Sequence, residues 1–103
     1  MPGGWTLYHY EGKWYEKEFV EVEVSDTRLV VEVEAEEEDI VTITATSKDG
    51  VTYRGDYRYR EGSSSNGEVL FERFRSSAGD VLIGEWHEGG GPTGKWIIKV
   101  NPA

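Results

Sequence analysis

Apolar and polar residues alternate at a period of two along most of this chain, and this pattern constrains the fold more than any other feature. Turn residues interrupt the alternation about every ten positions, as is typical of short antiparallel β-strands. Amphipathic stretches of helical period are absent from the sequence. The pattern predicts eight strands, at Trp5–Tyr10, Glu16–Val24, Arg28–Ala35, Ile40–Thr46, Val51–Arg60, Glu68–Arg75, Val81–His87 and Lys95–Val100.

The residues between these strands favour tight connections. Asp49-Gly50 predicts a type I′ turn, Asn66-Gly67 ends a loop rich in glycine and serine, and 78–80 fits a three-residue turn. Helical crossovers have no room, so each strand is expected to pair with its neighbour in an up-and-down meander. Pairing of the first strand with the last would close an eight-stranded antiparallel barrel without bare edges. The alternatives are a β-sandwich or a partly open barrel.

Length and charge limit the classes of function. With 103 residues, the chain is expected to form one all-β domain over 1–103. Its 20 acidic against 11 basic residues give a net charge of -9, which repels phosphate backbones and anionic membranes, so neither nucleic acid nor membrane is an expected partner. The sequence has no cysteine, no apolar leader and no run of membrane-spanning length. It predicts a soluble protein, cytoplasmic or recombinant.

All four tryptophans follow a glycine by two positions. The triplets are Gly3-Gly4-Trp5, Gly12-Lys13-Trp14, Gly84-Glu85-Trp86 and Gly94-Lys95-Trp96, and Gly55-Asp56-Tyr57 repeats the device with tyrosine. Residues two apart share one face of a strand, so the glycine offers the ring a patch without side chains. The triplets therefore predict that the four tryptophans are mainly packing residues.

These triplets, set in an eight-strand meander, resemble the avidin-like and lipocalin-like barrels. The resemblance implies a barrel whose interior holds one small ligand. It also implies a basic residue stacked on the first-strand tryptophan, a position that Lys99 could match, although arginine is more usual there. The regular Glu/Val/Thr-rich segment 21–46 is similar to computationally designed β proteins.

Two strands carry the candidate ligand-binding residues. On the fifth, Val51, Tyr53, Gly55, Tyr57 and Tyr59 share a face that is expected to point inward. On the sixth, the inward face is either the one with Phe71 and Arg73 or the one with Leu70 and Phe74, and either choice places charge inside one end of the barrel. A buried charge needs a partner or a ligand. The candidate ligand-binding residues are Tyr53, Tyr57, Phe71, Arg73, Trp86 and Trp96.

The sequence predicts a non-enzymatic binding module that encloses a small aromatic or apolar ligand. His9 and His87 lack a predictable orienting carboxylate, and the serines gather in a flexible run, so no catalytic residue, metal ligand or cofactor is predicted. Two alternatives remain open. The first is an acidic protein-interaction domain that meets a basic partner through Glu21, Glu23, Glu32 and Glu34, and the second is a designed or structural scaffold without a ligand.

Overall fold

A computed structural model describes residues 4–34, 40–59, 66–89 and 91–101. This part of the chain contains eight strands, and it contains no helix that is long and apolar enough to cross a membrane. The strands are β1 (Gly4–Tyr10), β2 (Lys13–Val24), β3 (Arg28–Glu34), β4 (Ile40–Ser47), β5 (Thr52–Tyr59), β6 (Asn66–Ser76), β7 (Gly79–Glu88) and β8 (Thr93–Val100). The all-β prediction is confirmed.

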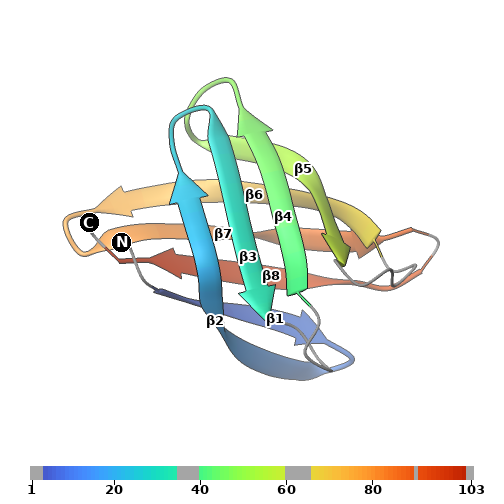
Figure 1. Ribbon diagram of the computed structural model, residues 1–103. Coiled ribbons are helices and arrows are strands. Elements are labelled where there is room, and N and C mark those ends of the chain that lie inside the picture. The colour runs from blue at the N-terminus through green and yellow to red at the C-terminus, as the bar shows by residue number, and fades with distance from the viewer. Residues whose placement is uncertain (1–3, 35–39, 60–65, 90, 102–103) are drawn as a thin grey trace.

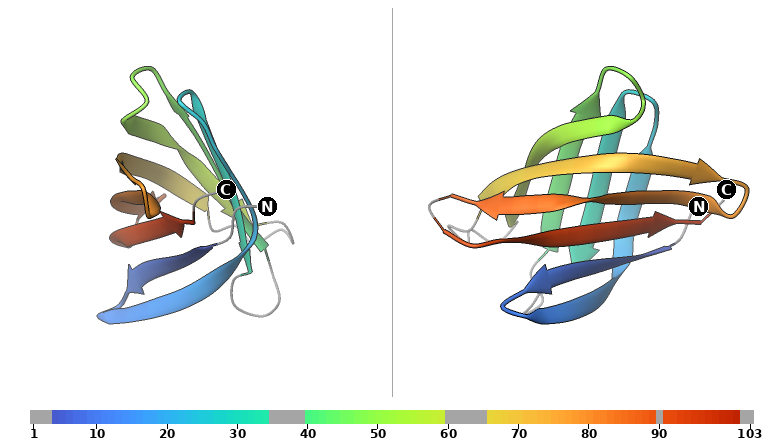
Figure 2. Two further views of the ribbon diagram at one scale, coloured as in Figure 1. Left: turned by 90° about the vertical axis from the view of Figure 1, so that its left-hand side faces the viewer. Right: turned by 180° about the vertical axis from the view of Figure 1, so that it is seen from behind.

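The strands form an antiparallel meander, as predicted. Each strand pairs with the next, and β1 also pairs with β8, with Gly4 opposite Val100 and Tyr8 opposite Trp96. The sheet curls into a barrel-like shape in which β2, β3 and β4 cross in front of β6, β7 and β8 (Figure 1). The two side views show the same curl, with β1 following β8 along the lower part of the sheet (Figure 2).

A bulge helps β2 to turn between the two groups of strands. The register of β2 against β3 shifts between Phe19 and Glu21, so the alternation is interrupted once. A bulge bends its strand and increases the local twist. The 12-residue β2 can therefore begin beside β1 and end beside β3, which runs in a different direction (Figure 1).

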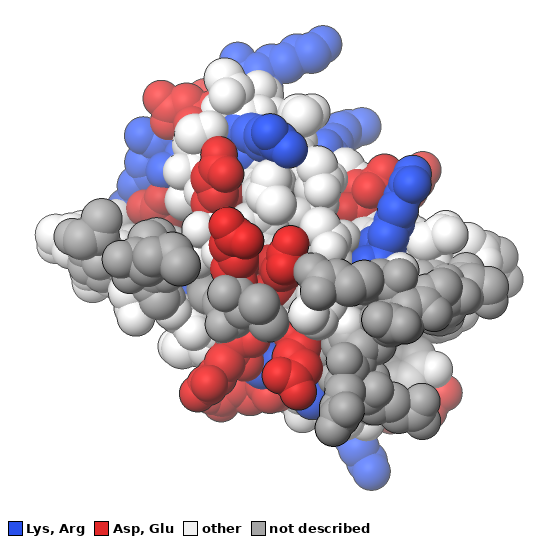
Figure 3. Space-filling view, viewed as in Figure 1, with Lys and Arg blue, Asp and Glu red and all other residues white. Residues whose placement is uncertain are grey.

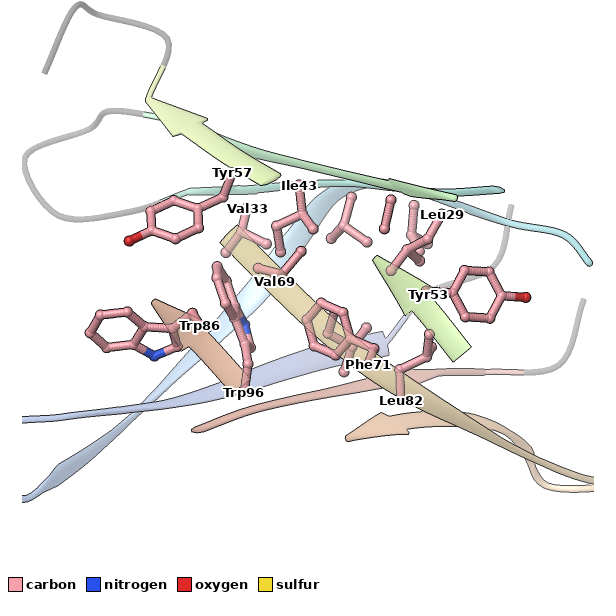
Figure 4. Close-up of a cluster of buried hydrophobic side chains, with 14 of the residues drawn as sticks. Leu29, Val33, Ile43, Tyr53, Tyr57, Val69, Phe71, Leu82, Trp86 and Trp96 are labelled. Carbon is pink, nitrogen blue, oxygen red and sulfur yellow. The ribbon is translucent and has the colours of Figure 1, made fainter. Parts of the chain in front are cut away.

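The inner face of the sheet forms one apolar core. In β3, Leu29, Val31 and Val33 are at most 1% exposed, whereas the residues between them are half-buried, as the period-two pattern predicts. The core residues are Val22, Leu29, Val31, Val33, Val41, Ile43, Ala45, Tyr53, Tyr57, Val69, Phe71, Leu82, Trp86, Trp96, Ile98 and Val100. Side chains from β3 and β4 meet those from β6, β7 and β8 in the middle of the molecule (Figure 4).

The type I′ turn lies elsewhere than predicted. Such a turn needs positive φ at both central residues, and Glu11 and Gly12 have φ values of 51° and 80° between the paired residues Tyr10 and Lys13. At the predicted position only Gly50 has a positive φ. There the Asp49 carboxylate accepts hydrogen bonds from the backbone N–H groups of Val51 and Thr52. These bonds build a wider loop.

Candidate functional site

The two glycine–tryptophan triplets of β7 and β8 face each other in reciprocal register. Gly84 pairs with Trp96, and Trp86 pairs with Gly94. A Cβ atom built on Gly94 would lie 2.6 Å from two atoms of the Trp86 indole. Each indole therefore has a glycine directly across from it on the neighbouring strand, in addition to the glycine two residues earlier in its own strand. This crossed pairing places both tryptophans in the core, 6% and 5% exposed.

The two indoles belong to a cluster of rings that we call the aromatic end. Tyr57 contacts both of them edge-on, with ring centroids 6.4 Å from Trp86 and 5.9 Å from Trp96. Trp96 also contacts Phe71 at 6.3 Å. The aromatic end consists of Tyr8, Tyr10, Tyr57, Phe71, Trp86 and Trp96. Figure 4 shows Tyr57, Trp86 and Trp96 together at one side of the core.

Tyr57 reaches across a glycine to a carboxylate. Gly67 pairs with both Tyr57 and Glu88, so the three residues form one row across β5, β6 and β7. A Cβ on Gly67 would lie 2.8 Å from the tyrosine ring, and the ring occupies that space. The Tyr57 hydroxyl donates a hydrogen bond to Glu88 Oε1 at 3.3 Å. Burial raises the pKa of Tyr57 above its usual range, and the Glu88 carboxylate raises it further, so the phenol keeps its proton at neutral pH.

A pocket of about 470 Å³ lies against this row. Its lining is a block of three adjacent strands, consisting of Asp56, Tyr57, Arg58, Asn66, Gly67, Glu68, His87, Glu88 and Gly89. Three of these residues are acidic, and the exposed Asp56 already has Arg58 within 3.9 Å. The pocket is therefore electronegative, and Tyr57 is the residue that joins it to the aromatic end.

The indole nitrogens of Trp86 and Trp96 have no hydrogen-bond partner among the described residues. The same is true of the hydroxyl of Thr6, which is fully buried on β1. Leaving a buried donor unpaired costs about 1–3 kcal/mol, and native structures keep few such groups. The three groups lie on β1, β7 and β8, which are neighbours in the sheet.

The opposite end of the core holds the charge that the sequence places inside. Arg73 points inward beside Phe71, which settles the orientation of β6, and its side chain is 9% exposed. Arg73 donates through Nε to Asp80 at 2.9 Å and through Nη1 to the Tyr53 hydroxyl at 2.9 Å, and Asp26 lies 3.4 Å away. Burial lowers the pKa of Arg73, but the hydrogen bonds to Asp80 and Tyr53 outweigh this effect and the net pKa is raised.

The structure therefore divides the predicted ligand-binding residues between two places. Tyr57, Phe71, Trp86 and Trp96 meet at the aromatic end, whereas Tyr53 lies at the other side of the core (Figure 4). Arg73 is with Tyr53, and Asp80 neutralises it. A carboxylate bound by Arg73 could not belong to the same small ligand as a ring stacked on Trp86. Sequence reasoning missed Gly67 and Glu88, whose roles depend on a row across three strands.

The sequence predicts that all four tryptophans are mainly packing residues, and the structure buries two of them, Trp86 and Trp96, in the core. Trp5 is 37% exposed and Trp14 is 50% exposed. Trp14 lies on the outer face of the β1–β2 hairpin, where its ring is 5.0 Å from that of His9. Glycine-x-tryptophan spacing fixes that the two residues share a face, but the same spacing occurs whether that face points inward or outward.

The histidines do not form a metal centre with other residues of the described ranges. No group of three or more His, Asp or Glu side chains there could hold an ion. His87 lies 3.4 Å from Glu85, which also pairs with Lys95, and His9 packs on Trp14. Both imidazoles lie on exposed or half-buried parts of the outer surface.

Comparison with known proteins returned no matching family model, no matching curated protein and no matching solved structure. The avidin-like and lipocalin-like resemblance therefore rests on the triplets and the meander alone.

Proposed function

We propose that the protein is a non-enzymatic binding module whose site lies at the aromatic end and takes a small ligand with a planar aromatic or apolar part. The observation that carries the proposal is the position of Tyr57, which lines the 470 Å³ pocket and contacts Trp86 and Trp96. Ligand pockets commonly measure roughly 300–1,000 Å³, and the volume of this pocket lies in that range.

The packing of the core restricts where such a ligand can lie. Buried side chains fill the middle of the molecule, so the site is an end of the barrel and not its centre (Figure 4). The proposal includes the finer fold predicted from sequence, an eight-stranded barrel closed by the ladder between β1 and β8, because closure would hold the indoles of β7 and β8 against Tyr8 and Tyr10 of β1.

Ligand binding should raise the melting temperature and quench tryptophan fluorescence, because a ligand that binds only the native state stabilises it by mass action. A panel of planar aromatic compounds should contain members that raise the melting temperature by several degrees. Trp86→Ala and Tyr57→Ala should each weaken the apparent affinity for such a compound at least tenfold. The increase in melting temperature, measured from the variant's own melting temperature, should be smaller accordingly. Trp14→Ala, on the outer face, is the matched control and should leave it unchanged.

A panel without any stabilising compound would contradict the binding proposal. The protein would then be better described as a scaffold, the role that its filled core and regular segment 21–46 also fit.

One observation favours a second candidate function, an acidic domain that binds a basic protein. Glu21 and Glu32 stand directly opposite each other on the outer face of β2 and β3. Glu23 and Glu34 are exposed on the same face. Figure 3 shows acidic side chains grouped on the face that β2 and β3 present. This acidic face would attract a basic partner.

Replacing these four glutamates with glutamine should slow association with a basic partner, because it removes the charges that steer the partner toward this face. The difference from the parent should be largest at low salt, since opposite charges are screened beyond about 10 Å at 0.1 M salt. The measurement is a pull-down from lysate, beside the parent, at low and high salt. The control carries glutamine at four other exposed positions, Glu11, Glu16, Glu18 and Glu72. Equal recovery of every protein by the parent and both variants would mean that the acidic face is not a docking surface.

A further inference from the structure

One half of the sheet is apolar on its outer face as well as on its inner face. On β6, β7, β8 and β1, most of the residues that alternate with the buried core residues are apolar, and they are half-buried or exposed. Ile83 of β7, for example, is 46% exposed. We call these residues the outer patch, which consists of Trp5, Leu7, Leu70, Phe74, Val81, Ile83 and Ile97.

The outer patch is continuous across four neighbouring strands. Ile83 pairs with Ile97, and Ile97 pairs with Leu7, so these three residues form one row across β7, β8 and β1. Phe74 pairs with Val81 in the next row. The four strands lie side by side in the view from behind (Figure 2, right). A solvated face of an antiparallel sheet is usually polar, so a continuous apolar patch marks an interaction surface.

The charged residues among these apolar side chains balance one another. Glu85 and Lys95 stand opposite each other on β7 and β8, and their side chains form an ion pair. Glu72 stands opposite Ile83, and Lys99 lies between Val81 and Trp5. The rows of the patch therefore hold two acids and two lysines, although the whole chain has a net charge of -9. Repulsion between the remaining charges of two copies is screened beyond about 8 Å at 0.15 M salt.

The order of residues along the rows makes the outer patch complementary to a second copy of itself. A two-fold axis that runs parallel to the strands between β7 and β8 lays β7 of one copy over β8 of the other. Glu85 then faces the second copy's Lys95, and Ile83 faces the second copy's Ile97. One strand further out, Phe74 of β6 faces the second copy's Trp5 on β1. Each contact occurs twice, as an isologous interface requires.

Other two-fold axes through the patch bring like charges together. An axis along β8 lays Lys95 and Lys99 on the same residues of the second copy, and an axis along β7 does this with Glu85. An axis across the strands, through the row of Ile97, lays Lys95 on the second copy's Lys99. Like charges that meet across an interface oppose association. Of these placements, the axis between β7 and β8 is the one that pairs acid with lysine.

We propose that the protein forms a symmetric homodimer through the outer patch, with β7 of each copy packed on β8 of the other. The patch measures about 20 Å in each direction at the usual spacing of strands and residues. It is therefore small beside the roughly 800 Å² that each partner buries in a standard interface, and the dimer has a Kd of about 10–100 μM. None of the pocket-lining residues belongs to the patch, so the proposal does not depend on a ligand.

Sedimentation of the full chain tests the proposal without any substitution. The weight-average mass should rise from 11.7 kDa at about 1 μM protein toward twice that value at about 1 mM. Ile83→Lys should weaken the association at least tenfold, because it places a charge on an apolar neighbour and enters the dimer twice. Val51→Lys is the matched control, since Val51 is 45% exposed but lies outside the patch, between β4 and β5.

Two charge reversals test the register of the copies. In a homodimer of Glu85→Lys the new lysine faces Lys95, and in a homodimer of Lys95→Glu the new glutamate faces Glu85, so each variant alone should dimerise at least tenfold more weakly than the parent. When the two variants are mixed, every facing pair again has opposite signs, and the heterodimer should form with nearly the parent affinity. Native mass spectrometry with one variant isotope-labelled distinguishes the three dimers.

The mixture isolates the contact between copies. Each variant loses its internal ion pair between positions 85 and 95, and mixing does not restore that pair within either chain. Recovery in the mixture therefore reports on the interface, and both side chains are exposed enough for the variants to fold.

Three outcomes overturn the proposal. A mass of 11.7 kDa throughout the concentration series would show that the patch does not bind a second copy. If that monomer bound phosphatidylcholine vesicles and Ile83→Lys abolished the binding, the patch would face a neutral lipid surface instead. Association that Ile83→Lys and Val51→Lys weaken equally would place the interface elsewhere. A mixture of the two charge variants without preferred heterodimer would contradict the packing of β7 on β8.

Discussion

Removal of residues 94–103 is expected to unfold the protein. Strand β8 forms the ladder to β7 on one side and to β1 on the other. It also supplies Trp96, Ile98 and Val100 to the core, all at most 5% exposed. Losing one large buried side chain costs roughly 2–5 kcal/mol, and the stability of a small domain is only about 5–15 kcal/mol. The loss of three, together with two ladders, should exceed the whole stability.

The shortened chain should lose the cooperative thermal transition seen by circular dichroism and should bind a dye that reports exposed apolar surface. A chain that ends at Asn101 is the matched control, because it keeps every residue of β8. A shortened protein that stayed monomeric with an unchanged melting temperature would show that the pairing of β1 with β8 contributes nothing to stability.

The strands could be predicted from sequence wherever only one face is apolar. In β4, Val41, Ile43 and Ala45 alternate with threonines, and all three are at most 4% exposed. The pattern is less informative in β1, where Trp5 and Leu7 lie on the outer face while Thr6 is fully buried. Hydropathy alone would favour the reverse, because it does not include the ladders to β2 and β8 that orient this strand.

Charge was the second source of ambiguity. Arg73 is inward although Leu70 and Phe74, on the other face of β6, are 39% and 49% exposed. The pattern of β6 alone does not show which face is buried, because the acidic partners that stabilise a buried guanidinium come from other segments. These partners are Asp80 on β7 and Asp26 before β3.

The candidate site was predicted in part for the same reason. Tyr57, Trp86 and Trp96 were identified because each follows a glycine in a strand, a local signal. Glu88 was not, because its contact with Tyr57 spans 31 residues and depends on Gly67 between them. The reciprocal register of the β7 and β8 triplets follows from the loop between them, and a sequence does not fix the geometry of that loop.

Gly84→Ala should strongly destabilise the protein, although alanine is ordinarily the better residue in a strand by about 0.5–1 kcal/mol. A Cβ at Gly84 would lie 1.8 Å from the carbonyl oxygen of Leu70 and 2.8 Å from the Cα of Phe71. Both are backbone atoms of β6, so no side-chain rotation can relieve the clash and the two strands must move apart. Overpacking commonly costs 1–3 kcal/mol and occasionally more, and we expect about 3 kcal/mol here.

That loss corresponds to a melting temperature lower by roughly 10 to 25 °C for a domain of this size, and urea denaturation should show the same change at an unaltered slope. Gly89→Ala is the control, because a Cβ there meets no atom within 4 Å and the residue has no left-handed φ. It should change the stability by less than about 0.5 kcal/mol. Because Gly84 also faces Trp96 across the ladder, separating β6 from β7 should shift the buried tryptophan emission to longer wavelength in Gly84→Ala alone. Equal stability of the two variants would contradict the claim that the close approach of β6 and β7 requires glycine at position 84.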